Sequence, residues 1–302
     1  MKKEEVEKRM KEEILRSKKG FIAALDQSGG SSSKTLALYG VGPDQYHNDE
    51  EMFEQIHQMR ARVITNEAFT SDKILGVILF KRTMESQIEG EYTANYLWEK
   101  KGIPSFLKID LGLEEAQDGV QLLKDIPDLD DILDEALKYG IVGTKMRSVI
   151  HEYNEYGIKK VIEQQFKLAK RIIAKGLIPI VEPEVSIDSN DKALIEAFMK
   201  KVIRDELNKM KADDLLIFKF TIPSKNDFYD ELLKYKNVVR IVALSGGYSR
   251  TDACEKLKSN KKMIASFSRA LLEGLNVNQT EEEFTTALND AISLIYDASV
   301  KK

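Results

Sequence analysis

The segment NEYGIKKVIEQQFKLAKRIIAKGLIPIVEPEV, residues 154–185, contains a helix pattern followed by a strand pattern. Asn154–Lys175 carries apolar residues at helical spacing, and Gly176 is a typical residue for ending a helix. Leu177–Val185 is a nearly continuous apolar run, as expected of a strand that is buried on both faces. A crossover helix of this length joins strands that lie parallel, so the segment predicts one unit of a parallel α/β fold.

The same alternation recurs along the rest of the chain. Seven further runs are predicted strands: Gly20–Gln27, Ile74–Phe80, Ser105–Asp110, Ile141–Arg147, Leu215–Thr221, Val238–Ser245 and Met263–Ser268. The helical patterns between them cover Asn48–Thr65, Asp128–Tyr139, Asp191–Lys211, Ser249–Ser259 and Thr280–Val300. Eight such units predict a (β/α)8 TIM barrel with an additional N-terminal helix, and a doubly wound open sheet is the alternative. Residues 1–302 are expected to form a single domain, because no Pro/Gly/Ser-rich linker divides them.

Composition excludes several classes of protein. The 302 residues carry 46 Lys+Arg against 50 Asp+Glu, a net charge of -4, which argues against a dedicated nucleic-acid binder. The longest apolar run, Ile74–Phe80, is far too short to span a membrane, and the charged N-terminus does not resemble a signal peptide. The single cysteine, Cys254, excludes an intramolecular disulfide and fits a reducing compartment. We therefore expect a soluble cytoplasmic protein.

Ionisable residues interrupt the apolar strands close to their C-terminal ends. They are Asp26, Lys108, Asp110, Lys145, Arg147, Glu182, Glu184 and Lys219. Burying an unpaired charge is costly, so each of these groups needs a partner or a use. The plain alternative is a buried ion-pair network, or strands that simply end in solvent. Because barrel enzymes keep their active sites at the C-terminal ends of the strands, several strands with charges at this end favour an active site.

Lysines among carboxylates point to amine chemistry. A lysine that lies in apolar surroundings beside other cations can act as a nucleophile and form a Schiff base with a carbonyl substrate. Lys219 has the most apolar neighbours, and Glu182 or Glu184 could move the protons that this reaction requires. The three histidines lie far apart, none at zinc-site spacing, so we expect a route without a metal.

Two glycine- and serine-rich segments suggest anion binding. Ser245, Gly246 and Gly247 follow the seventh strand, and Ser268 and Arg269 follow the eighth, where TIM barrels often bind phosphate. A plain tight turn is the alternative for the glycines. The segment SGGSSSK, residues 28–34, follows the first strand, and we expect it to be an active-site loop that could hold a second phosphate.

The sequence also resembles a known family, the class I fructose-bisphosphate aldolases, and most of all their shorter bacterial form. The resemblance runs from Gly20 to about Leu272. It rests on motifs that follow the family's order: KKGFIAALDQSGGS, FLKID, GTKMRS, PIVEPEV, FKFTIP, ALSGGYSR and ASFSRAL.

This resemblance implies a reaction and a set of roles. The reaction is the reversible, metal-independent cleavage of fructose 1,6-bisphosphate, in glycolysis and gluconeogenesis, to dihydroxyacetone phosphate and glyceraldehyde 3-phosphate. Lys219 matches the Schiff-base lysine, Glu182 the carboxyl that exchanges protons during imine formation, and Glu184 its neighbour. Asp26 and Lys145 match the pair that serves carbon–carbon cleavage. The residues that match substrate or phosphate contacts are Ser28, Ser31, Lys34, Lys108, Arg147, Ser245, Gly246, Ser268 and Arg269.

The chain departs from the longer animal members of this family in one respect that bears on mechanism. Those enzymes use a C-terminal tyrosine for proton exchange at the dihydroxyacetone phosphate carbon, whereas this sequence ends in DASVKK. Tyr296 lies in a helical pattern, so we do not assign it this role. The family is commonly oligomeric, and we expect a homo-oligomer. The alternatives are another Schiff-base sugar-phosphate aldolase and a non-catalytic sugar-phosphate-binding or scaffold protein.

Overall fold

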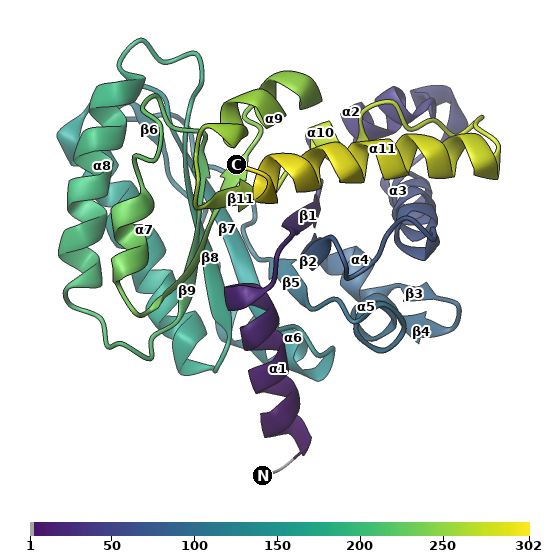
Figure 1. Ribbon diagram of the computed structural model, residues 1–302, viewed down its shortest axis with the longest axis horizontal. Helices are drawn as coiled ribbons and strands as arrows, with labels where there is room; N and C mark the ends of the chain where they lie inside the picture. Colours follow the sequence, from purple (N-terminus) through teal and green to yellow (C-terminus); the bar gives the residue numbers. More distant parts are fainter. Residues whose placement is uncertain (1–2) are drawn as a thin grey trace.

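The computed structural model describes residues 3–302 and contains a barrel of parallel strands surrounded by helices (Figure 1). Within these residues, eight parallel strands follow one another around the barrel in chain order. They are β1 Phe21–Leu25, β2 Ile74–Leu79, β5 Ser105–Lys108, β7 Gly143–Ile150, β8 Ile178–Val185, β9 Leu216–Thr221, β10 Val238–Leu244 and β11 Met263–Ala265. The Ala24 amide donates to the carbonyl of Phe267 at 3.2 Å, which joins the first strand to the segment after the last. The predicted TIM barrel is confirmed, and the open sheet is wrong.

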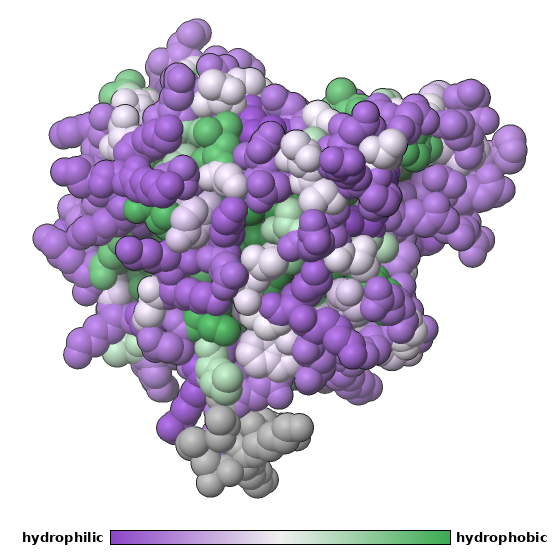
Figure 2. All heavy atoms as spheres, turned by 45° about the vertical axis from the view of Figure 1, so that its right-hand side comes forward, coloured by the Kyte–Doolittle hydropathy of each residue, from purple (hydrophilic) through white to green (hydrophobic). Residues whose placement is uncertain are grey.

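Helices connect the strands as their patterns predicted. The longer ones are α3 Asp49–Thr65, α6 Leu129–Lys138, α7 Glu155–Ala174, α8 Lys192–Leu207, α9 Arg250–Lys258 and α11 Glu281–Val300. Asn48 and Asn154 accept hydrogen bonds from the amides of Glu51 and Gly157, and so cap α3 and α7. None of the described helices is long and apolar enough to cross a membrane, and the face in Figure 2 is mostly hydrophilic.

Shorter elements fill the connections, and most of them lie outside the predicted set. The helices are α2 Gly30–Tyr39, α4 Lys81–Glu85, α5 Thr93–Lys101 and α10 Arg269–Leu272, with 3-10 turns at Pro43–Gln45 and Asp230–Lys234. The strands are β3 Gln87–Ile88 and β4 Glu91–Tyr92, which form a hairpin, and β6 Val120–Gln121, which pairs antiparallel with β7. The predicted loop at residues 28–34 is wrong in part, because residues 30–34 begin α2, which buries Leu36 and Tyr39 against the core.

Successive side chains of each strand point to opposite faces of the sheet and belong to two separate apolar layers. In β1, Phe21, Ala23 and Leu25 belong to the core beneath the helices, whereas Ile22 and Ala24 belong to the barrel interior. The interior also contains Phe106, Ile180 and Ile217, from β5, β8 and β9. Two residues further along each of these strands come Lys108, Glu182 and Lys219. Since side chains at i and i+2 share a strand face, these charged groups continue the inward-facing rows toward the C-terminal ends of the strands.

The N-terminal helix α1, Lys3–Ser17, covers the opposite end of the barrel. Its Leu15 is buried and packs with the interior residues. The Arg240 side chain at the start of β10 donates to the carbonyls of Leu15 and Lys18 at 2.9 and 3.1 Å. These contacts satisfy carbonyls that the helix leaves open at its C-terminal end, and they fix α1 beneath the strands.

Candidate active site

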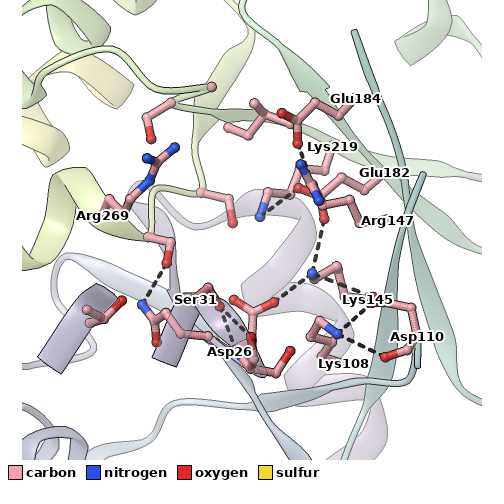
Figure 3. Close-up of a pocket in the computed structure, with 18 of the residues that line it drawn as sticks. Asp26, Ser31, Lys108, Asp110, Lys145, Arg147, Glu182, Glu184, Lys219 and Arg269 are labelled. Atoms are coloured by element: carbon pink, nitrogen blue, oxygen red, sulfur yellow. Dashed lines mark hydrogen bonds and ion pairs between the residues drawn. The ribbon is translucent and has the colours of Figure 1, made fainter. Parts of the chain in front are cut away.

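A chain of alternating charges crosses the C-terminal mouth of the barrel (Figure 3). The Lys219 Nζ lies 3.2 Å from Glu182 Oε1, and the Lys145 Nζ lies 3.3 Å from Glu182 Oε2. Lys145 Nζ also lies 2.6 Å from Asp26 Oδ2. All four side chains are buried. The structure thus brings residues from β7, β8, β9 and the end of β1 into one continuous path between two amines and two carboxylates.

Further ion pairs extend this path on both sides. Lys108 Nζ contacts Asp110 Oδ1 at 2.5 Å and also donates to the Asp110 carbonyl at 2.9 Å. The other carboxylate oxygen of Asp110 is buried, makes no hydrogen bond and lies 3.9 Å from Lys145 Nζ. Two residues beyond Lys145 and Glu182 on β7 and β8, Arg147 Nε donates to Glu184 Oε2 at 2.5 Å.

Electrostatics decide the charge states of this cluster. Burial by itself raises the pKa of Asp26, but the ammonium groups of Lys145 and Lys219 outweigh burial and hold that pKa well below its usual range. Burial lowers the pKa of Lys145, but the carboxylates of Asp26 and Glu182 outweigh burial and raise it above its usual value. At neutral pH, Asp26 is therefore a carboxylate and Lys145 an ammonium.

These side chains line a cavity of about 540 Å³. All but one of the candidate catalytic and binding residues from the sequence lie along this cavity. They are Asp26, Ser28, Ser31, Lys34, Lys108, Lys145, Arg147, Glu182, Glu184, Lys219, Ser245, Gly246, Ser268 and Arg269. Gly247 is exposed and does not line the cavity. The polar mouth and its mixed lining fit a small, charged ligand better than an apolar one.

One side of the cavity is built from the turns after β10 and β11. Gly246 and Gly247 have φ values of 63° and 111°, in the left-handed region that glycine tolerates. A Cβ at Gly246 would lie 2.9 Å from Ile187 Cγ2, so a larger residue would also crowd the turn. Arg269 follows β11 and points its guanidinium into the same region (Figure 3).

The segment after β1 forms another side. The Ser28 amide donates to Ser31 Oγ at 2.9 Å, and this hydroxyl donates to the Ser28 carbonyl at 2.7 Å. These two bonds hold the first turn of α2 against the end of β1. Lys34 is exposed one turn further along α2. Because Lys34 lies on a helix rather than on a loop, its backbone has a fixed position relative to Asp26.

Comparison with known proteins identifies the family of this chain. The profile of the family described as "Glycolytic: Fructose-bisphosphate aldolase class-I" matches residues 7–219. The chain belongs to the class I fructose-bisphosphate aldolase family. A solved structure of fructose-bisphosphate aldolase from Plasmodium falciparum, in complex with TRAP and a small-molecule inhibitor, is similar in fold, with a TM-score of 0.77. It shares 18% sequence identity over 98% of this chain and 94% of its own. Cgl0159 from Corynebacterium glutamicum is similar at a TM-score of 0.52 and 12% identity, over 95% of this chain and 92% of its own.

The family match covers one part of the candidate site. Asp26, Lys145, Glu182 and Lys219 fall inside residues 7–219, with Lys219 at the last matched position. The turns after β10 and β11 fall outside that range. The fold nevertheless brings these turns to the same cavity.

Two further residues support the cavity at the mouth of the barrel, and neither was among the candidate site residues from the sequence. Gln27 Nε2 donates to Ser268 Oγ at 2.7 Å and so ties the end of β1 to the turn after β11. The fully buried Arg60 donates to the Gln27 carbonyl at 2.6 Å, to Gln27 Oε1 at 3.1 Å and to Thr83 Oγ1 at 2.6 Å. Burial lowers the pKa of Arg60 to about 10, against the opposing effect of Asp26, so Arg60 remains a cation behind the site.

Other groups with reactive side chains lie away from the aldolase cavity. Cys254 is buried in α9, where burial raises the pKa of its thiol to about 11. Tyr296 lies on α11 and does not line the cavity. Residues 3–302 contain no cluster of three or more His, Cys, Asp or Glu side chains placed to hold a metal ion.

Proposed function

We propose that this aldolase reversibly cleaves fructose 1,6-bisphosphate to dihydroxyacetone phosphate and glyceraldehyde 3-phosphate through a Schiff base on Lys219. The observation that supports this most is the path from Lys219 through Glu182 and Lys145 to Asp26, with contacts of 3.2, 3.3 and 2.6 Å. Such a path places a nucleophilic amine, a proton carrier and a base in one desolvated site.

The first half of the reaction forms the iminium. The Lys219 ammonium passes a proton to Glu182, and the resulting neutral amine adds to the C2 carbonyl of the open-chain sugar and gives a carbinolamine. Glu182, whose carboxyl lies beside the amine, donates the proton with which the C2 hydroxyl leaves as water. The nitrogen then carries the positive charge of the iminium, which withdraws electrons from the neighbouring carbon–carbon bond.

The second half breaks the bond between C3 and C4. The ionised Asp26 accepts the proton of the C4 hydroxyl, the bonding pair of C3–C4 passes into the iminium, and the aldehyde half leaves. Lys145, held as an ammonium, stabilises Asp26 as a carboxylate until it receives the proton. The enamine then gains a proton at C3 while Asp26 gives up the proton that it received, and hydrolysis of the resulting iminium releases dihydroxyacetone phosphate and regenerates Lys219.

We assign the two phosphates to the two ends of the cavity. Ser245, Gly246, Ser268 and Arg269 bind the phosphate on the ketone half, since backbone amides at a turn and a guanidinium are strong phosphate donors. The surface made by Ser28, Ser31 and Lys34 binds the phosphate on the aldehyde half. Lys108 and Arg147 lie along the cavity between charged partners and contact the substrate's hydroxyl or phosphate groups.

A comparison of two substrates tests this assignment. Lys34→Ala should lower kcat/KM for fructose 1,6-bisphosphate about tenfold, equivalent to the loss of about 1.4 kcal/mol. The same variant should leave kcat/KM for fructose 1-phosphate within about twofold, because that substrate has no phosphate on the aldehyde half. Equal losses for both substrates would remove Lys34 from the phosphate site, and a preference for a sugar phosphate of another chain length would replace the proposed substrate.

The catalytic assignment has its own test. Lys219→Met should abolish cleavage while binding of inorganic phosphate stays measurable by calorimetry. Wild-type cleavage should persist in EDTA. A Lys219→Met variant that stays active would exclude Lys219 as the nucleophile, and phosphate binding without cleavage by the wild type would favour a non-catalytic sugar-phosphate binder.

A further inference from the structure

A second cationic cavity lies at the opposite end of the barrel from the aldolase site. It has a volume of about 310 Å³ and lies between the end of α1, the starts of β10 and β11, and the end of α11. Six of the residues that line it are cations: Arg16, Lys18, Lys19, Arg240, Lys261 and Lys262. No carboxylate lines it, and the other lining residues are neutral.

The cations of this basal cavity have no acidic partner within ion-pair distance. Within residues 3–302, none of the six forms an ion pair. Arg240 has a structural role, since it donates to carbonyls of α1. Two carboxylates lie nearby without lining the cavity. Asp227 accepts a hydrogen bond from the backbone amide of Lys261 at 2.6 Å, and burial raises the pKa of Asp230 against the opposing effect of Lys262 and Lys261.

This concentration of like charge is unfavourable unless something offsets it. A cavity of this volume is about 8 Å across, which is no more than the Debye length of about 8 Å at physiological ionic strength, so salt screens the repulsion only in part. The chain as a whole is acidic, with 50 Asp+Glu against 46 Lys+Arg. A shortage of carboxylates therefore does not explain why none lines this cavity.

We propose that the basal cavity binds a small anion that carries two or more phosphate groups. Its volume lies near the lower end of the range for small-molecule sites, about 300–1,000 Å³. Lysine ammonium groups bind phosphates as point charges, and a single phosphate would leave several of these cations without a partner. The ligand bridges the end of α1 to the start of β11, because Lys18 and Lys19 lie on one side and Lys261 and Lys262 on the other.

The basal cavity is separate from the aldolase site. Arg240 lies near the start of β10, whereas Ser245 follows its end. At about 3.3 Å per residue, this strand separates the two sites by roughly 15–20 Å. The two cavities share no lining residue, so the proposal for the basal cavity does not rest on the proposed catalytic reaction.

Isothermal titration with inorganic tripolyphosphate, at constant ionic strength, tests the proposal. Because this probe can also enter the aldolase site, the titrations use full-length protein that carries Lys34→Ala and Arg269→Ala. We expect this background to retain one binding site. Adding Lys19→Glu and Lys262→Glu should weaken binding at least tenfold, whereas the control pair Lys167→Glu and Lys201→Glu, with the same change in net charge, should weaken it less than twofold.

The substituted side chains are exposed in both pairs, so folding should be kept, and circular dichroism checks it. If the charge reversals unfold the protein, Lys19→Gln with Lys262→Gln replaces them, with several-fold weaker binding expected. If the basal and control pairs weaken the binding of tripolyphosphate equally, the net charge of the protein alone attracts this anion, and the proposal is overturned. Absence of binding in the Lys34→Ala, Arg269→Ala background would also overturn it.

Discussion

Lys145→Met should destabilise the protein most at neutral pH, because it removes the cation that neutralises Asp26. Lys145 Nζ contacts Asp26, Glu182 and Asp110 at 2.6, 3.3 and 3.9 Å, and all of these side chains are buried. Removing one partner of a buried ion pair costs about 3–5 kcal/mol. At pH 7.5 we expect Lys145→Met to lower the free energy of unfolding by an amount within this range. The loss should not exceed it, because Lys219 and Lys108 still offset part of the carboxylate charge.

The pH dependence follows from the pKa of Asp26. In the wild type this pKa lies below the unfolded value, so Asp26 contributes stability above about pH 4 and loses it as pH falls through the folded pKa. In Lys145→Met we expect the folded pKa of Asp26 to rise above the unfolded value, because burial then outweighs the remaining cations. The destabilisation should then shrink by up to about 1.4 kcal/mol per pH unit as pH falls from the new folded pKa toward about 4. The raised pKa of Lys145 itself contributes stability that is fully present throughout this range, so it adds no slope.

Urea unfolding followed by circular dichroism at pH 7.5 and pH 5 measures the loss in the free energy of unfolding and its change with pH. The matched control is the double variant Asp26→Asn with Lys145→Met, in which the carboxylate is also gone. The loss caused by Lys145→Met should be smaller in the Asp26→Asn background, because the two side chains are coupled. A loss below about 1 kcal/mol, or one that does not change between pH 7.5 and pH 5, would refute the view that Lys145 sets the charge state of Asp26.

Three further outcomes are expected. Arg269→Ala should raise KM for fructose 1,6-bisphosphate at least about tenfold in steady-state assays, with a smaller change in kcat, because a phosphate donor is lost. Arg60→Met should raise the same KM about fivefold to tenfold by releasing Gln27 and with it Ser268, a loss of about one hydrogen bond. Gln27→Ala should reproduce most of this effect, and an unchanged KM in both would mean that Arg60 only fills space. Leu15→Ala should lower the free energy of unfolding by about 2–5 kcal/mol through a cavity under the barrel, with kcat/KM unchanged.

The strands were predictable because each is a continuous apolar run between helical patterns. The β8 run was predicted as Leu177–Val185 and is observed as Ile178–Val185. The charged ends of the strands were predictable for the same reason, since an ionisable group in a buried strand is conspicuous. The pairing of these charged residues could not be predicted, because the 3.2 Å contact between Lys219 and Glu182 depends on the register of β8 and β9 around the closed barrel.

Two local features escaped prediction for physical reasons. The segment GSSSK has the composition of a loop, yet it forms the first turn of α2 because Leu36 and Tyr39 anchor the later turns in the core. Arg60 sits within the apolar stripe of α3, beside the buried Met59 and Val63. Its position on that stripe was a signal that the side chain points inward, where hydrogen bonds from the guanidinium order Gln27.

Borohydride reduction in the presence of fructose 1,6-bisphosphate, followed by peptide mass mapping, tests the central claim most directly. Reduction fixes an iminium as a stable amine, so the modified lysine keeps the substrate's carbon skeleton. We predict a substrate-dependent adduct on the peptide that contains Lys219, and no such adduct in Lys219→Met. An adduct on another lysine, or cleavage that EDTA abolishes and borohydride fails to trap, would contradict a Schiff base at Lys219.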